Sequence, residues 1–234
     1  WVDEGRIGQL QVVRTRGKWD HRSGGEDLAV LGPHMMDSMR YMAGSSVKWV
    51  HAHVQSNGKS VRVEDAHIGN EGIGLISGDQ ITAHYAFKNG VTGYFESLPN
   101  HKSTSRNTRH FGFELHGTEG ILSLRNSPNG EMYIYKDGLF IPNDEVAWER
   151  VYIDEWEAVP LNERTHYSNV RIVKELLEAM EKGSEVVEAS SGEDALAAQE
   201  MIVAVHESHI KGGRVGLPLV NRENPYSVGR SLET

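Results

Sequence analysis

His34 and Asp37 have the residue types and spacing for acid–base chemistry at the start of a helix. Pro33 suits the first turn of a helix, where its missing N–H would be unpaired, and Gly44 can adopt the left-handed conformation that ends one. Residues three apart share a helical face near the positive N-terminal end, which favours a neutral imidazole able to take a proton. The alternative is that His34 has only a structural role at the start of the helix. The buried face of this helix is predicted at Met35, Met36, Met39, Met42 and Ala43.

A second pair of histidines, His206 and His209, is also three residues apart on a predicted helix. With Glu200 or Glu207 the two imidazoles could chelate a metal, which would favour a metal-assisted hydrolase or lyase. Spacing alone does not assign the third ligand, so no metal site is expected. The chain has no cysteine, which excludes disulfides, thiolate metal sites and a cysteine nucleophile, and fits a reducing compartment.

Length and composition limit the class of protein. The 234 residues can form one large domain or two small ones with a sizeable core. A net charge of −9 without a basic run argues against binding to a phosphate backbone, and no apolar stretch approaches the ~20 residues that a membrane span needs. Because the chain starts at Trp1 and enters a strand-like pattern almost at once, we expect a piece of a longer protein. That protein is expected to be cytoplasmic by default, although an export signal could precede Trp1.

Alternating apolar residues predict a series of short strands. They are expected at residues 8–16, 47–54, 81–88, 91–97, 111–115, 121–124, 132–135, 139–141 and 147–153. Asn89-Gly90 is expected to form a type I′ hairpin turn, which requires positive φ at both central residues. Polar loops are expected at residues 17–27 and 59–71, the second of them mobile.

The last third of the chain changes to a helical period. Val170, Val173, Leu176, Leu177 and Met180 fall on one stripe that ends before Gly183. A capping-box-like start at Ser191 and Asp194 opens a second helix that continues to about Lys211. Hairpin-linked strands with a few helices predict an α+β fold, in which helices cover one face of an antiparallel sheet. With no repeat and no clear linker, residues 1–234 are expected to form a single domain.

Several short motifs occur in an order that resembles one known family. Gly24-Gly25-Glu26-Asp27-Leu28, then Leu-Gly-x-His-x-x-Asp at residues 31–37, then Gly44, are similar to the C-terminal domain of the Gfo/Idh/MocA (glucose–fructose oxidoreductase / inositol dehydrogenase) family. The resemblance continues along nearly the whole chain, through residues 5–8, 87–93, 116–120, 191–195 and 213–219. It implies a large, open, mainly antiparallel sheet whose free face meets the substrate or a neighbouring subunit, in a homodimer or homotetramer.

The resemblance also implies how the chemistry is divided. In the family, an N-terminal half binds NAD or NADP and carries a Glu-Lys-Pro motif, and this chain has neither that motif nor a Gly-x-Gly-x-x-Gly behind a strand. The glycine-dense run at residues 69–74 lacks the strand–turn–helix setting of a phosphate cradle. His34 matches the family's acid/base on the substrate hydroxyl. Asp37 also matches, and either orients the imidazole or bonds only locally.

The sequence departs from the family at Val30, where an Asp is common four residues before the histidine. A valine side chain cannot tune the pKa of the His34 imidazole as a carboxylate could. Glu26 or Asp27 could supply a carboxylate from the loop instead. This departure is compatible with a divergent oxidoreductase or with a member that has lost redox activity.

Residues for substrate binding are expected in two places. Arg106, Arg109 and His110 lie between two strands and could bind sugar hydroxyls or a carboxylate, unless they form only a solvated loop. His166 and Tyr167 precede a helix, where the family often contacts substrate, unless they only pack there. The favoured interpretation is the substrate-binding half of an NAD(P)-dependent oxidoreductase acting on a sugar, polyol or related hydroxy compound, inactive on its own. The alternative is a non-catalytic carbohydrate-binding or assembly module of the same fold.

Overall fold

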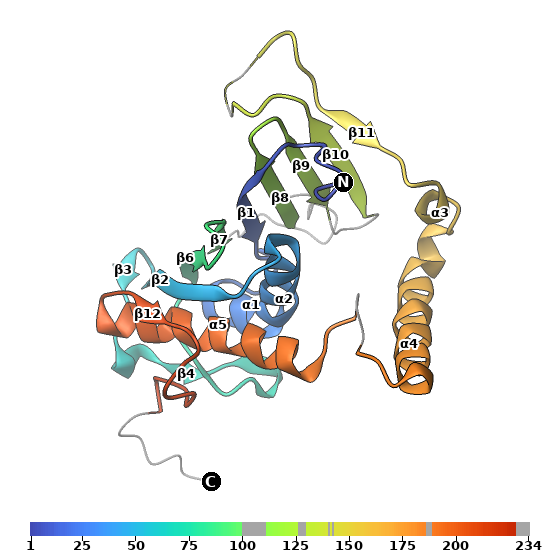
Figure 1. Cartoon of the computed structure of the whole chain (residues 1–234). Coiled ribbons are helices and arrows are strands. Elements are labelled where there is room, and N and C mark those ends of the chain that lie inside the picture. The colour runs from blue at the N-terminus through green and yellow to red at the C-terminus, as the bar shows by residue number, and fades with distance from the viewer. Residues whose placement is uncertain (100–110, 126–129, 140, 142, 186–188, 228–234) are drawn as a thin grey trace.

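A large mixed sheet dominates the computed structural model, which describes residues 1–99, 111–125, 130–139, 141, 143–185 and 189–227 (Figure 1). Its strands are β1 (Leu10–Arg16), β2 (Val47–Ser56), β3 (Lys59–Ser60), β6 (Gln80–Phe87), β7 (Thr92–Ser97), β8 (Gly112–Gly117), β9 (Ile121–Arg125), β10 (Glu131–Tyr135), β11 (Glu149–Val151) and β12 (Val215–Gly216). They lie in the order β11-β10-β9-β8-β1-β7-β6-β2-β12, and β3 pairs with β2. The predicted open, mainly antiparallel sheet is confirmed.

The first strand of the chain lies in the middle of this sheet. β1 pairs antiparallel with β8 on one side and parallel with β7 on the other, with Val12 opposite Thr92. Among the described strands the other pairings are antiparallel. β1 therefore joins a group of later hairpins to the β2–β6–β7 group.

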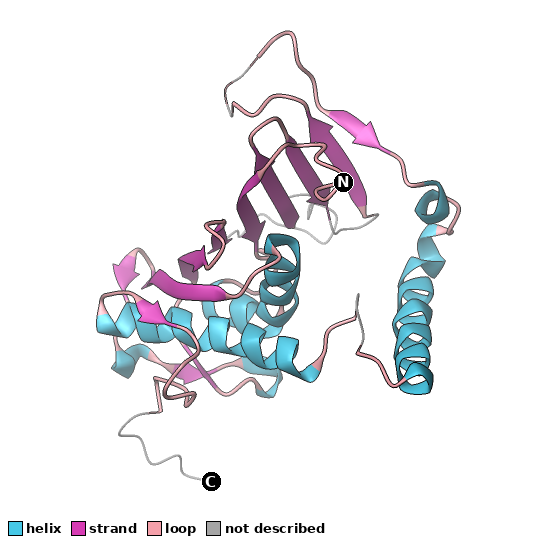
Figure 2. Cartoon of the chain, in the orientation of Figure 1, coloured by secondary structure: helices cyan, strands magenta, loops and turns pink. Residues whose placement is uncertain are grey.

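Helices cover one face of the sheet (Figure 2). These are α1 (Gly24–Val30), α2 (Gly32–Ala43) and α5 (Gly192–Lys211). The inward residues of the strands, such as Val13, Tyr85 and Phe95, are buried with Met39 and Met201 of the helices. The alternate strand residues face away from the helices, because neighbouring side chains in a strand point to opposite faces. The predicted α+β fold with helices on one face is confirmed.

Three of the predicted helices end at a glycine. Gly44, Gly183 and Gly212 all have the left-handed conformation, at φ 60°, 61° and 65°. Ser191 caps α5 with the predicted box: its hydroxyl accepts from Asp194 N at 3.1 Å, and the Asp194 carboxylate accepts from Ser191 N at 3.1 Å. The signals for helix ends in this sequence were therefore correctly located.

A further pair of helices stands beside the main body (Figure 1). α3 (Asp154–Glu157) leads through a 3₁₀ turn at Leu161–Glu163 into α4 (Arg164–Lys182). The predicted apolar stripe of α4 is present, but it faces solvent: Leu176 is 50% and Met180 is 71% exposed. No helix in the described parts of the chain is both long and apolar enough to cross a membrane.

The predictions for three segments were wrong. The predicted loop 17–27 contains the start of α1, because Gly24 and Gly25 let the helix lie directly against the backbone of residues 77–79. The loop at 59–71 contains β3, β4 (His67–Ile68, paired with β5, Leu75–Ile76) and two 3₁₀ turns. Leu139 and Ile141 do not form a strand.

The turn at Asn89-Gly90 is not type I′. Gly90 has φ 92°, but Asn89 does not have positive φ. The loop is longer than a two-residue turn, since Phe87 N donates to Val91 O at 3.0 Å. The Asn89 side chain is used instead for tertiary contact, because its amide donates to Ala43 O at 2.8 Å at the end of α2.

Candidate active site and open sheet face

His34 lies in the first turn of α2, as predicted, and its side chain is exposed. Pro33 occupies the start of the helix, while Met35 and Met36 are buried beneath it. The 3.6-residue period of α2 therefore directs the imidazole away from the core while its neighbours anchor the helix. An exposed ring at the positive end of a helix can exchange a proton with a bound hydroxyl.

Asp37 contacts one residue of its own helix and one residue far along the chain. Its Oδ1 lies 3.8 Å from Arg40 Nη1, and its Oδ2 accepts from the Ser190 hydroxyl. Within the described residues no hydrogen bond joins Asp37 to His34. The contact with Ser190 fastens the chain ahead of α5 to α2.

The carboxylates of the loop before α2 are also engaged elsewhere. Glu26 accepts hydrogen bonds from the backbone and side chain of Asn70. Asp27 is buried and accepts from Lys18 N at 3.1 Å and from the Ser97 hydroxyl at 2.7 Å. Burial raises the pKa of Asp27 despite these bonds. Neither carboxylate therefore takes the place of the Asp that the family commonly has at the position of Val30. Asp27 instead supports the turn after β1.

A row of aromatic rings crosses the open face of the sheet. The Trp49 ring meets His84 edge-on at 4.9 Å between centroids, and His84 stacks on Tyr94 at 5.1 Å. Arginines close both ends: Arg214 lies over Trp49 at 4.2 Å, and Arg14 lies over Tyr94 at 5.5 Å. Burial, followed by the nearby charge of Arg214, lowers the pKa of His84. This row borders a hollow of about 650 Å³.

An ion-pair cluster continues the open face from β7 to β9. Arg16 bridges Glu96 at 2.7 Å and Glu114 at 3.1 Å, and Glu114 also lies 3.7 Å from Arg125. Hydrogen bonding to His116, followed by the Arg16 contacts, holds the pKa of Glu114 at about 2 although burial opposes it. Sequence reasoning missed both groups. The only available signal was the two-residue alternation of polar and aromatic side chains on the strands.

Of the predicted substrate residues, His166 and Tyr167 lie within the described part of the chain, where no hydrogen bond joins either to His34. Arg106, Arg109 and His110 lie outside the described residues. His166 and Tyr167 were predicted to precede a helix, but both lie inside α4, which begins at Arg164. His166 is exposed, and the Tyr167 ring packs edge-on against Trp156 at 6.4 Å between centroids. Tyr167 borders a shallow groove of about 630 Å³ on α4.

The histidines of α5 are used by the protein itself. His206 is buried, with Nδ1 3.1 Å from the Tyr226 hydroxyl. His209 Nδ1 accepts from Val54 N at 3.1 Å, so its Nε2 carries the proton and donates to Val61 O at 2.9 Å. No lone pair of His209 is left for a metal, and the described residues contain no group of three metal-ligating side chains.

The glycine-dense run does not have the setting of a dinucleotide-binding motif. The glycine-dense run at residues 69–74 forms a 3₁₀ turn at Asn70–Gly72 between β4 and β5, and no helix begins there. A phosphate cradle needs backbone N–H groups at the start of a helix. Residues 69–74 therefore do not form a phosphate cradle.

The comparisons define the class of protein. Residues 2–217 match the C-terminal alpha/beta domain of the oxidoreductase family, and the chain therefore belongs to the Gfo/Idh/MocA oxidoreductase family. No match is found among curated proteins.

Solved structures share this fold at low sequence identity. Levoglucosan dehydrogenase in complex with NADH and levoglucosan is 19% identical, with a TM-score of 0.66 over 94% of this chain and 62% of that chain. An oxidoreductase from Agrobacterium radiobacter in complex with NAD+, L-tartaric acid and magnesium is 18% identical, with a TM-score of 0.57 over 92% and 59%. A super-repressor mutant of Gal80p from Saccharomyces cerevisiae is 13% identical, with a TM-score of 0.59 over 92% and 60%. The chain thus spans about three fifths of the length of these structures.

Proposed function

We propose that this chain is the substrate-binding and oligomerisation half of an NAD(P)-dependent oxidoreductase that acts on a sugar, polyol or related hydroxy compound. The observation that carries the proposal is His34, an exposed imidazole at the start of α2 in a member of this family. A half that holds the dinucleotide would precede this chain in the full-length protein.

In this proposal the work is divided between the two halves. The nicotinamide, when bound by the other half, supplies the hydride acceptor. His34 takes the proton of the substrate hydroxyl during oxidation and returns it in the reverse direction, which requires hydrogen-bond reach to that hydroxyl. The buried methionines beneath α2 hold the helix in place while leaving the ring free to approach the substrate.

The substrate class is proposed from the relatives and from the chemistry of the residues expected to contact the substrate. Levoglucosan and L-tartaric acid, named with two similar structures, are both hydroxy compounds. Arg106, Arg109, His110, His166 and Tyr167 are proposed to contact the substrate, since their donors suit hydroxyl and carboxylate oxygens. The row of rings and arginines on the open face supports a homodimer or homotetramer formed through that face.

The test is turnover by the full-length protein with His34→Ala. Loss of a general acid/base lowers the rate by about 10²- to 10⁴-fold, and we expect this loss in kcat with substrate affinity retained. His67→Ala, which removes an exposed histidine on β4, is the control and should leave kcat unchanged. Unchanged turnover in the His34 variant would refute the assigned role.

A non-catalytic carbohydrate-binding or assembly module is the second candidate. It is favoured by Val30 in place of the usual carboxylate and by the contacts of Asp37 with residues other than His34. This function predicts that the full-length protein binds a sugar without oxidising it, and that His34→Ala leaves ligand-dependent behaviour intact. Measurable NAD(P)H formation by the wild-type protein would remove it.

A further inference from the structure

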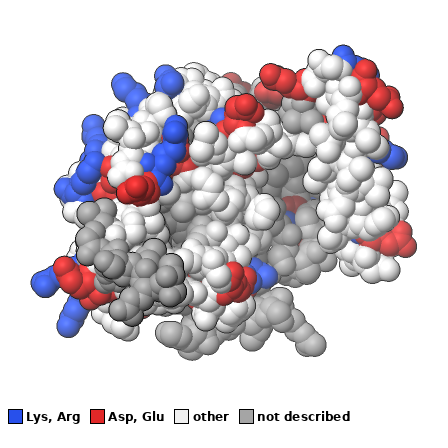
Figure 3. All heavy atoms as spheres, turned by 90° about the horizontal axis from the view of Figure 1, so that it is seen from below, with Lys and Arg blue, Asp and Glu red and all other residues white. Residues whose placement is uncertain are grey.

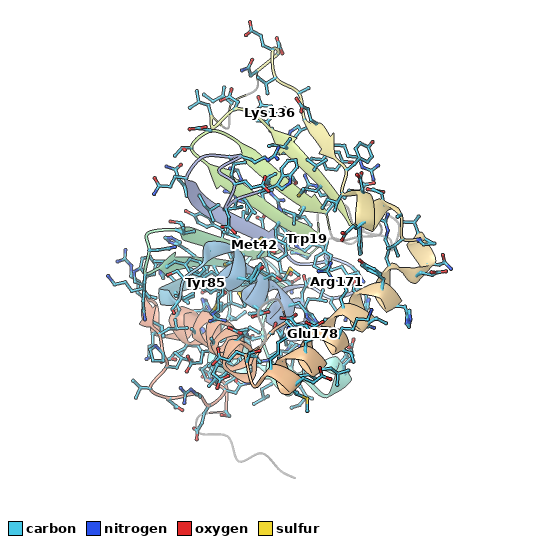
Figure 4. All side chains as sticks on the ribbon, turned by 45° about the vertical axis from the view of Figure 1, so that its right-hand side comes forward. Trp19, Met42, Tyr85, Lys136, Arg171 and Glu178 are labelled. Atoms are coloured by element: carbon cyan, nitrogen blue, oxygen red, sulfur yellow. The ribbon has the colours of Figure 1, made fainter. Side chains whose placement is uncertain are left out.

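The hollow beside the row of rings lies on the opposite side of the sheet from His34. Its floor is formed by residues of β1, β7, β6 and β2, and the end of α5 borders it. Tyr85, the residue after His84 on β6, is fully buried and lies beside the helices (Figure 4). His84 therefore points to the open face, since neighbouring side chains of a strand point to opposite faces.

Four side chains of the floor stand next to one another because the strands are in register. Arg14 of β1 is opposite Tyr94 of β7, and Tyr94 is opposite His84 of β6. His84 is in turn opposite His51 of β2. Neighbouring strands are about 4.8 Å apart, so these side chains form a continuous line across the floor of the hollow.

The rings in this line present polar edges to the hollow. Tyr94 and His84 stack with 16° between their ring planes, and the Arg14 guanidinium lies over Tyr94 from the other neighbouring strand. Both faces of the Tyr94 ring are therefore occupied within the protein. A ligand in the hollow contacts the Tyr94 hydroxyl, imidazole nitrogens and the N–H groups of Arg14, which favours a compound rich in oxygen over an aromatic one.

The charges around the hollow favour an anion. The carboxylates of Glu96 and Glu114 are bound to Arg16, at 2.7 Å and 3.1 Å, and among the described residues Arg14 forms no ion pair. The histidines of the floor add positive charge when they are protonated. In Figure 3 many Lys and Arg side chains gather on the left, the side that carries β2, β3 and β12 in Figure 1. This end of the molecule is therefore suited to attract anions, although the chain has a net charge of −9.

The size of the hollow suits a small organic molecule. Its volume is about 650 Å³, and sites for small molecules in proteins are about 300–1,000 Å³. An inorganic ion would leave most of this space unfilled. Thr82 and Ser60 also line the hollow, and their hydroxyl groups can both donate and accept hydrogen bonds. These groups match a ligand that carries hydroxyls in addition to its charge.

We propose that the hollow binds a small polyhydroxylated anion, either a sugar acid or a sugar phosphate. The anionic group pairs with Arg14, and the hydroxyls bond to Tyr94, Thr82 and the histidines of the floor. This inference goes beyond the proposed function and does not depend on it, because the hollow and His34 lie on opposite sides of the sheet. The line of side chains occupies only part of the open face, so subunit contacts can form on the rest of it.

The test measures D-gluconate binding to the full-length protein by calorimetry, in the wild type, Arg14→Gln and Arg214→Gln. Arg214 is the matched control, since it also lies over a ring of the row but does not line the hollow. Loss of a charged hydrogen-bonding partner should raise the Kd about 10-fold or more in Arg14→Gln. Arg214→Gln should change the Kd less than about twofold, because salt at physiological strength screens charges beyond about 8 Å.

Two further probes identify the anionic group. D-glucose 6-phosphate carries a phosphate in place of the carboxylate, and the tighter of the two anions reports which group the hollow prefers. D-glucose has the hydroxyls without the charge and should bind about 10-fold or more weakly than the better anion. Binding of both anions should tighten from pH 8 to pH 6, as the histidines of the floor gain protons.

Three results would overturn the proposal. One is the absence of binding of either anion to the wild type. Another is an equal rise in Kd in both arginine variants, which would show only a general effect of positive charge. The third is unchanged anion binding in Arg14→Gln with a smaller sedimenting mass, which would identify a second copy of the chain as the occupant of the hollow.

The outcome is separable from that of the proposed function. Binding of D-gluconate that depends on Arg14 should persist in His34→Ala, and its loss there would place the ligand at His34 and refute the separate site. Binding that depends on Arg14 in a wild-type protein without turnover on sugars or polyols supports the hollow while refuting the acid/base role.

Discussion

Acid should destabilise this protein through His206. The ring is 7% exposed, and burial, followed by the charge of His209, lowers its pKa to about 4. The unfolded chain takes up a proton near pH 6.5, whereas the folded chain does not until about pH 4. The unfolded state therefore binds more protons between these values, so the stability contributed by the neutral ring is present above pH 6.5 and is lost as the pH falls.

The size of the loss follows from the two pKa values. Between pH 7.5 and pH 5 the difference in proton binding corresponds to about 2 kcal/mol from His206 alone. For a domain of this size that is a fall in Tm of about 4–8 °C. His84 and His209 also have lowered pKa values and add to the same trend, so the contribution of His206 has to be isolated by substitution.

The assay compares urea unfolding of the wild type and His206→Gln at both pH values. Glutamine can still bond to Tyr226 but does not titrate, so the variant should lose about 2 kcal/mol less than the wild type on acidification. His166→Gln removes an exposed ring and should follow the wild type. Equal losses in the wild type and His206→Gln would refute the reasoning, because His206 would then accept its proton within the folded protein.

Two further substitutions test local structure. Ser191→Ala removes the hydroxyl that caps α5 through Asp194 N, and should lower the free energy of unfolding by about 1 kcal/mol, measured by urea titration. Gly17→Ala would place a methyl group 1.7 Å from Asp27 Oδ2, a buried carboxylate held by two hydrogen bonds, and should cost about 2 kcal/mol in the same assay. Gly213→Ala, with nothing within 4 Å of the added atom, is its control, and an equal effect at both glycines would contradict the packing argument.

Much of the fold was predictable because its signals are local. The alternation in Ile81, Ala83, Tyr85 and Phe87 places the buried face of β6, and Gly183 ends α4 where the helical period ends. These features depend on neighbours within a few residues, which a sequence pattern records directly.

The structural features that the sequence did not predict depend on residues far apart in the chain. Gly24 and Gly25 indicate a loop by composition, yet they open a helix because only glycine allows close packing on Gly78 and its neighbours. The Asn89 amide donates to Ala43 O outside the hairpin, a contact that no short-range pattern contains. The row of rings on the open face likewise arises from strand order, which the sequence does not state.

The candidate site also has one feature that the sequence predicted and one that it did not. The position of His34 in the first turn of α2 followed from Pro33, the methionine spacing and Gly44. The partner of Asp37 could not be predicted, since Ser190 is 153 residues away along the chain. The sequence therefore predicts which residue is a candidate and which helix carries it. The contacts of that residue require the tertiary structure.

The central place of β1 has a consequence for how the chain is made. Arg16 meets Glu96 of β7 across 80 residues of sequence, so the first strand has no parallel neighbour until those residues have been synthesised. At the usual rate of translation this interval is on the order of ten seconds. The two groups of hairpins can form by themselves, but the sheet closes only when β1 enters between them, a long-range step of the kind that slows folding. During that interval neither edge of β1 has its native partner, and unpaired strand edges can pair with other chains.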